Sequence, residues 1–131
     1  MTAQELLEAA IAMVCEDPHD TDANSDYTER APYLLASFLS QCAPLDRTYR
    51  RAHALGDGSA FDGASFALDN VFPLSSVFAP AAVYYLAAML VLDENEVMSD
   101  RFFALYTDTL ASIQNALPAT VAPVLDKYKI V

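Results

Sequence analysis

The chain opens with apolar residues at the three- and four-residue spacing of a single helix face. Thr2 followed three residues later by Glu5 is the pattern of a capping box, in which each side chain bonds the backbone N–H of the other residue. Together these features predict a helix over residues 3–16. Its apolar face consists of Leu6, Leu7, Ala10, Ile11 and Val14.

A second apolar stripe begins at Tyr27 and predicts another helix, whose polar residues lie mostly opposite. Pro32 falls in its opening turns, so the helix is expected either to start late or to bend there, because proline has no backbone N–H to donate. Pro44 is expected to end this helix and to begin a short third one that carries several arginines. The stripe consists of Tyr27, Ala31, Leu34, Leu35, Phe38, Leu39 and Cys42.

Helical periodicity stops between residues 56 and 76, which include all three glycines of the chain. This segment is predicted to form a long ordered loop, with short extended pieces near residues 65–68 and 71–74. Loops of this length inside a small domain are usually functional or are ordered by a partner. Residues 79–92 then predict a helix that is apolar on nearly all sides, as is typical of a helix surrounded by others.

The last helical pattern runs from Met98 to Leu117 and ends at Pro118. Residues 118–131 contain a second proline, Pro123, and are expected to form an extended C-terminal tail. The sequence therefore predicts an all-α fold, with residues 1–131 in one helical domain. The expected architecture is a small bundle of about four to five helices, with a long irregular loop between the third and the fourth.

Composition favours one folded domain outside the membrane. Hydrophobic residues make up 54% of the chain and charged residues 19%, which is unlike the composition of disordered proteins. The longest apolar run, residues 77–92, is shorter than the roughly 18 to 20 residues that cross a bilayer. The N-terminus has no basic stretch typical of a secretory signal, so Cys15 and Cys42 are expected to be reduced thiols of a cytoplasmic protein.

The acidic balance of the chain bears on nucleic-acid binding. Eighteen acidic residues against seven basic ones give a net charge of −11, and the sequence pI is about 4.2. Affinity for DNA comes largely from basic side chains that neutralise phosphates. The sequence therefore disfavours specific nucleic-acid binding, whereas a surface that repels DNA is compatible with it.

The stretch DTDANSD, residues 20–26, has the oxygen-rich composition of a calcium-binding loop. In the register of an EF-hand, however, Ser25 stands where the turn requires glycine, and Ala31 stands where a bidentate glutamate is needed. The stretch is therefore interpreted as the turn before the second helix, with Asn24 or Ser25 as the N-cap. A zinc site is also disfavoured, because its candidate ligands show no C-x-x-C spacing: Cys15, His19, Cys42 and His53.

Motifs of common catalytic sites are missing from the sequence. It contains no glycine-rich phosphate loop, H-E-x-x-H or G-x-S-x-G, and a Cys–His nucleophilic pair has no supporting motif. The acidic cluster at residues 93–100 is interpreted as a solvated turn, and the aromatic residues between Tyr84 and Tyr106 as core rather than a base-stacking surface. The protein is not expected to be an enzyme, and no catalytic residue, cofactor or metal is predicted.

Two segments together resemble the small helical head-to-tail connector, or adaptor, proteins of tailed bacteriophages and prophages. They are SDYTERAPYLLASFLSQCAPLD and FPLSSVFAPAAVYYLAAMLVLDENEVMSDRFFALYTDTLASI. The likeness lies in a proline–leucine turn at residues 73–75, an apolar helix at 81–92, an acidic turn at 93–96, and Phe102 with Tyr106. The chain departs from the family in its longer, glycine-containing middle loop and in its unusually hydrophobic fourth helix.

The resemblance implies a structural subunit of a ring that joins the portal to head-completion or tail proteins around the DNA channel. Its expected partners are other copies of the chain, a phage portal protein and a head-completion or tail protein, in the bacterial host cytoplasm and then in the virion. The alternative is a small cytoplasmic helical domain that binds a partner helix between the second and fourth predicted helices. The expected subunit or portal contacts are Arg47, Arg50, Arg51, Tyr128, Ile130 and Val131.

Overall fold

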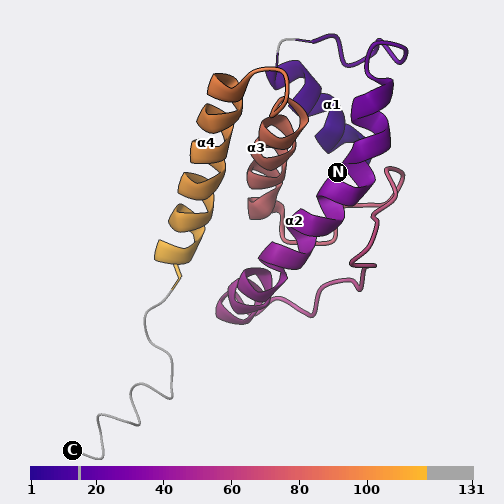
Figure 1. The fold of residues 1–131 in the computed structure, drawn as a ribbon. Helices are drawn as coiled ribbons and strands as arrows, with labels where there is room; N and C mark the ends of the chain where they lie inside the picture. The colour runs from indigo at the N-terminus through magenta and orange to yellow at the C-terminus, as the bar shows by residue number, and fades with distance from the viewer. Residues whose placement is uncertain (15, 118–131) are drawn as a thin grey trace, which may run out of the picture.

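The computed structural model describes residues 1–14 and 16–117, and these residues contain four α-helices and no β-strand. The predicted all-α fold is therefore confirmed. The predicted tail, with Tyr128, Ile130 and Val131, lies outside the described residues. The elements, labelled in Figure 1 apart from the 3-10 turn, are α1 (Ala3–Met13), α2 (Ser25–Ala52), the 3-10 turn η1 (Ser76–Phe78), α3 (Ala79–Leu90) and α4 (Glu96–Asn115).

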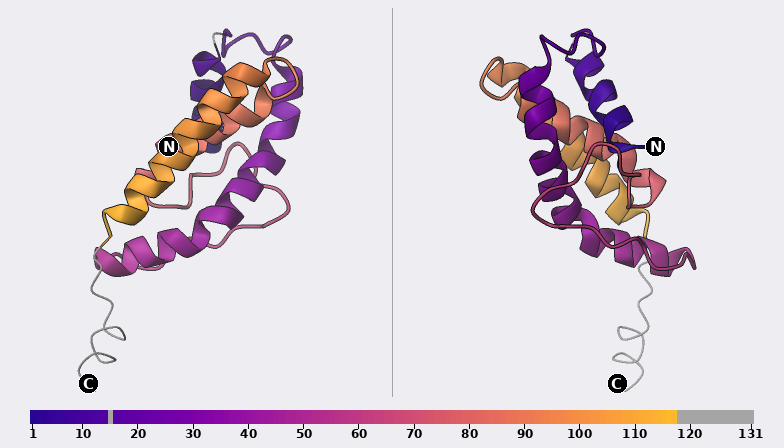
Figure 2. Two further views of the ribbon diagram at one scale, coloured as in Figure 1. Left: turned by 60° about the vertical axis from the view of Figure 1, so that its left-hand side comes forward. Right: turned by 90° about the vertical axis from the view of Figure 1, so that its right-hand side faces the viewer.

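Helix α3 lies at the centre of the bundle, in contact with α1, α2 and α4 (Figures 1 and 2). Eight of its twelve residues are buried, as its all-round apolar pattern predicts. None of the described helices is both long and apolar enough to cross a membrane. The largest fully buried side chains come from α1, α2, α3 and η1, and none comes from α4: Leu6, Leu7, Ile11, Leu35, Phe38, Leu39, Cys42, Phe78, Leu86 and Leu90.

The N-terminus of α1 is held by both its own capping box and the long loop. Thr2 and Glu5 form the predicted box. The next two free N–H groups are satisfied from the loop, since Ala3 N donates to the carbonyl of Asn70 at 2.9 Å and Gln4 N to that of Leu68 at 2.8 Å. Of the extended pieces expected in the loop, residue 71 forms only an isolated bridge with Thr2.

The expectation that Pro44 ends one helix and begins another was wrong. Helix α2 continues unbroken from Ser25 to Ala52, with Pro32 and Pro44 both inside it. Nor does it start late, because its first residue lies well before Pro32. Figure 2 shows α2 changing direction in its second half. Pro44 accounts for this bend, because its ring displaces the carbonyl of the preceding turn and removes one backbone hydrogen bond without ending the helix.

Three aromatic rings join α2, α3 and α4. The ring centroid of Phe38 lies 5.8 Å from that of Tyr85 and 6.0 Å from that of Tyr106, and the two tyrosine rings are 5.2 Å apart. Their hydroxyls donate to Ser37 Oγ and Gln41 Oε1, both at 3.2 Å, so the buried polar groups are satisfied. Tyr85 and Tyr106 are core residues, as interpreted from the sequence, but the same interpretation was wrong for Phe103, which is 46% exposed. Burial also raises the pKa of the neighbouring Cys42 thiol to about 11, which keeps it protonated at neutral pH.

The aromatic junction provides a stability test within one helix. Phe38→Ala should lower the free energy of unfolding by about 3–5 kcal/mol, because it removes a fully buried ring by which α2 contacts both α3 and α4. Tyr33→Ala is the matched control, since Tyr33 also lies on α2 but is 66% exposed, and it should change stability by less than about 0.5 kcal/mol. Urea denaturation followed by circular dichroism measures both. Equal losses in the two variants would contradict the central role of this junction.

Candidate functional site

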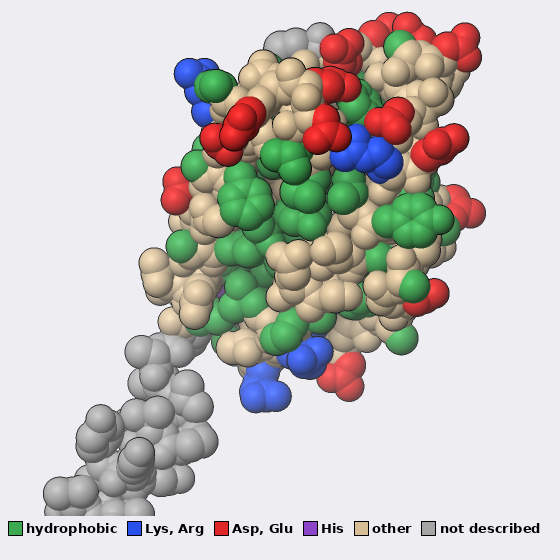
Figure 3. All heavy atoms as spheres, viewed as in Figure 1, with side chains coloured by type: hydrophobic (Ala, Val, Ile, Leu, Met, Phe, Trp, Pro, Cys, Tyr) green, Lys and Arg blue, Asp and Glu red, His purple; other side chains and the backbone are tan. Residues whose placement is uncertain are grey.

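Charged residues gather at opposite ends of α2. We define the acidic end as residues 16–29 and 93–100, which hold ten of the eighteen acidic residues and no lysine or arginine. These residues form the α1–α2 connection with the start of α2, and the α3–α4 turn with the start of α4. Figure 3 shows acidic side chains crowded along this part of the surface, at the top of the view.

The basic end consists of Arg47, Arg50 and Arg51, near the C-terminus of α2. A helix of 28 residues is on the order of 40 Å long, somewhat less when bent, so α2 separates the two ends by most of the length of the molecule. Basic side chains in the last turn also favour the negative end of the helix dipole. The interaction with the helix dipole explains why arginine suits this position, but it does not explain why three arginines are present.

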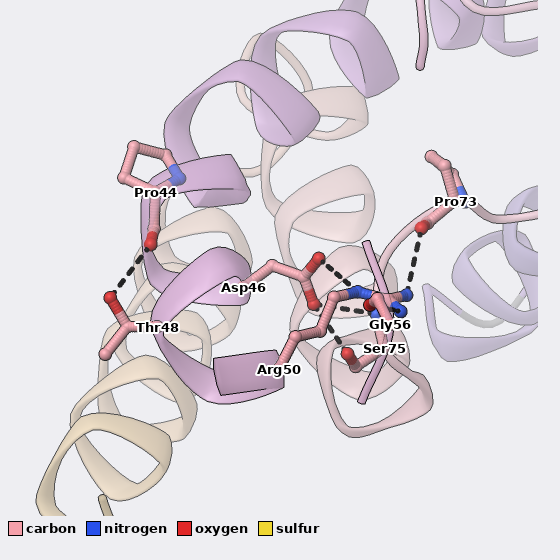
Figure 4. A network of polar contacts seen from close by, with 7 residues as sticks. All are labelled: Pro44, Asp46, Thr48, Arg50, Gly56, Pro73 and Ser75. Carbon is pink, nitrogen blue, oxygen red and sulfur yellow. Dashed lines mark hydrogen bonds and ion pairs between the residues drawn. The ribbon is translucent and has the colours of Figure 1, made fainter. Parts of the chain in front are cut away.

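A buried carboxylate organises the basic end (Figure 4). Asp46 is only 3% exposed. One of its oxygens, Oδ2, accepts from Arg50 Nε at 2.9 Å, and the other, Oδ1, accepts from both the backbone N and the Oγ of Ser75, at 2.9 and 2.6 Å. Asp46 thus links the bent half of α2 to the residue that precedes η1.

Arg50 extends this hydrogen-bond network, because it also bonds residues near both ends of the long loop. Its guanidinium donates to the carbonyl oxygens of Gly56 at 3.1 Å and Pro73 at 3.4 Å. Gly58 lies against the ion pair so closely that an added Cβ would be 3.2 Å from Arg50 Nε. The sequence predicted Arg50 as an intermolecular contact, but in the structure its donors are engaged within the chain.

Arg47 and Arg51 differ from Arg50 because both are exposed. Neither has an ion-pair partner among residues 1–14 and 16–117. Together with Arg50 they line an open cavity of about 210 Å³, bordered by Leu55, Asp57 and Gly58. Within the described residues, the guanidinium groups of these two arginines are therefore exposed and unpaired at this cavity.

Side-chain hydrogen bonds shape the turn that precedes α2 at the acidic end. In the DTDANSD stretch, Ala23 N donates to Asp20 Oδ1 at 3.1 Å. Asn24 is the N-cap residue by position, as interpreted, but its side chain donates to the carbonyl of Asp17 at 2.6 Å instead of capping α2. Among the residues that the structure describes, no group of three or more His, Cys, Asp or Glu side chains could hold a metal.

Two contacts fix the acidic end to the bundle. The Tyr27 hydroxyl donates to Glu94 Oε2 at 2.7 Å, which joins the first turn of α2 to the α3–α4 turn. Arg30 donates to the carbonyls of Met89 at 2.9 Å and Leu90 at 3.5 Å, and so satisfies acceptors at the C-terminus of α3. Burial, together with the bond to Glu94, raises the pKa of Tyr27 to about 12.

The Asp46 network is tested by removing its carboxylate. Asp46→Ala should lower the free energy of unfolding by about 3 kcal/mol, because it leaves the partly buried guanidinium without its anion and two Ser75 donors without an acceptor. Asp57→Ala removes an equal charge from an exposed position nearby and should cost less than about 0.5 kcal/mol. Chemical denaturation measures both variants, and comparable losses would show that the network does not hold the loop.

The Tyr27–Glu94 contact should make stability depend on pH under alkaline conditions. The folded-state pKa of Tyr27 is raised to about 12 from an ordinary value of 10.0, so the folded protein retains this proton longer than the unfolded chain. The stabilisation is complete below pH 10 and is lost as pH rises towards 12. Tyr27→Phe should therefore make the fall in unfolding free energy over this window shallower, whereas Tyr33→Phe, at an exposed position, should leave it as in the parent. Parallel curves for parent and Tyr27→Phe would contradict the shift.

Comparison of the chain with protein-family models, with curated proteins and with solved structures found no match. Function is therefore inferred from the surface of the protein. Among residues 1–14 and 16–117, that surface has an acidic end, a basic end with two arginines that form no ion pair, and no metal cluster.

Proposed function

We propose that the protein is a structural subunit of a phage head-to-tail connector ring, which joins a portal protein to head-completion or tail proteins around the DNA channel. The observation that carries this proposal is the separation of opposite charges to the two ends of α2. Because the ends differ, the complementary contact is between the basic end of one copy and the acidic end of the next. Such head-to-tail contacts generate rings when the rotation closes.

The partly covered helix α4 supports the same proposal. Only Ser99, Tyr106 and Ile113 of its twenty residues are buried, and α4 packs chiefly against α3. Apolar side chains remain on its surface, with Val97 65%, Phe103 46% and Leu105 43% exposed. Apolar area of this kind next to charged ends is typical of surfaces that other protein subunits cover.

The acidic surface suits a protein beside a DNA channel. With a net charge of −11, a wall made of several copies would repel the phosphate backbone and let DNA pass without adhering. Within this proposal the protein is not an enzyme. It needs no cofactor, and it acts first in the host cytoplasm and then in the virion.

One observation favours the alternative, a cytoplasmic interaction domain that binds a partner helix. An apolar groove of about 260 Å³ lies between α1 and the start of α3, lined by Met1, Ala9, Met13, Pro80, Val83 and Tyr84 among others. Methionine side chains adapt to different partners and are common in helix-binding grooves. This groove is not between α2 and α3, where the sequence placed the partner helix. A host protein captured through this groove, and lost on Met13→Glu, would favour the alternative.

Ring assembly is tested by reversing one charge at the basic end. Arg47→Glu should weaken assembly at least tenfold in concentration, because it replaces an attraction across the interface by repulsion. Analytical ultracentrifugation and electron microscopy over a concentration series, with and without portal protein, measure the effect. Arg101→Glu makes the same change in net charge at an exposed position beside the acidic end, where an added acid keeps the attraction to the basic end, so its assembly should not be weakened.

A complementary variant addresses the other side of the contact. Asp20→Lys with Asp22→Lys, in the exposed turn of the acidic end, should also weaken assembly and should partly restore it when combined with Arg47→Glu. If the parent stayed monomeric at all concentrations and did not bind portal protein, the proposal would be wrong.

A further inference from the structure

A second surface feature lies where the described part of the chain ends. An apolar groove of about 280 Å³ runs between the C-terminal half of α4, the end of α2 and η1. Its floor includes the buried side chain of Ile113 and the half-buried side chains of Tyr49 and Val77, and Leu117 lies at its edge. His53, Thr109, Ser112 and Ala116 complete the lining. The groove is smaller than most small-molecule pockets, so it suits a few aliphatic side chains rather than a cofactor.

The chain continues directly from this groove into an apolar sequence. After Pro118, residues 121–125 read VAPVL, in which four apolar residues flank Pro123. The following residues include Asp126, Lys127 and Lys129, so the apolar stretch is short and bounded by charge. Leaving it in water costs free energy that an apolar groove would recover, and Pro123 reduces the conformational entropy lost on docking.

We propose that residues 121–125 of the chain's own C-terminal segment occupy this groove. Leu117 already lines it, so residue 121 is tethered within a few residues of the binding surface. A tether this short gives an effective concentration in the millimolar range or above, well beyond the concentration of a second copy in solution. The segment of the same chain therefore occupies the groove in preference to that of another copy.

This inference is independent of ring assembly, because it concerns an isolated copy. It also divides the tail into two parts. Residues 121–125 belong to the groove, and residues 126–131 remain for a partner. The second part contains Tyr128, Ile130 and Val131, the three tail residues predicted to contact the portal. Docking of the first part would start this partner-binding end beside the basic end of α2, since Tyr49 and His53 flank Arg50 and Arg51 in sequence.

Disulfide formation within the chain tests the proposal. Ser112→Cys lies on the exposed rim of the groove and is paired with Val124→Cys in the full-length protein, with Cys15 and Cys42 replaced by Ala and the helical content checked by circular dichroism. The control pairs Ser112→Cys with Val131→Cys. Tethering alone should make the disulfide form only about twofold faster at position 124 than at position 131. Docking should make it form faster at position 124 by on the order of tenfold or more.

Each outcome of the cross-linking decides the proposal. Fast formation of a monomeric disulfide at position 124, lost when Ala116→Arg fills the groove, supports it. If the disulfide formed only about twofold faster at position 124 than at position 131, the proposal would be overturned and the groove would be open to a partner. A covalent dimer as the main product would also overturn it, because a second copy would then be the occupant.

Discussion

The structure depends on the need to cover α3 on every side. A helix that is apolar all round cannot face water, so α1, α2 and α4 each lie along it, and Phe38, Tyr85 and Tyr106 interlock where α2 and α4 meet over it. The three neighbouring helices cover the apolar surface of α3, but they cover little of one another's surface. Helix α4 in particular contributes its inner face to α3 and keeps its outer face exposed. The exposed apolar surface of α4 is therefore a consequence of how the core is closed.

The charged ends follow from the same arrangement. Because α2 must reach from the α3–α4 turn to η1, its two ends lie at opposite ends of the bundle, each held by several polar contacts. Tyr27 bonds Glu94 at the first end, and Asp46 bonds Ser75 at the second. The Asp46 network also takes one arginine out of the exposed basic surface, which leaves Arg47 and Arg51 to define it. Neighbouring arginines of one helix turn therefore differ: Arg50 is bonded within the chain, whereas Arg47 and Arg51 are exposed.

Helices could be predicted from the sequence because their apolar residues repeat at a local period. The pattern placed α1, α3 and α4 within a few residues of their observed ends, and the Thr2–Glu5 box was predicted correctly. Pro44 misled the prediction because a missing N–H disrupts one hydrogen bond, and packing against the core outweighed that local loss. The role of Arg50 was missed because its partners, Gly56, Pro73 and Ser75 through Asp46, lie in an aperiodic loop. The spacing of Asp46 and Arg50 on one helix face was the only local signal of that network.

The proposed self-association must overcome the mutual repulsion of copies that each carry a net charge of −11. Like net charges repel over long distances, but at physiological ionic strength the Debye length is about 8 Å, so charges on the far sides of two copies hardly interact. An arginine in contact with a carboxylate is only about 3–4 Å from it and is screened far less. Segregated charge therefore gives attraction where the copies touch, while salt removes most of the repulsion elsewhere. A uniformly acidic surface with the same net charge would have no such contact to form.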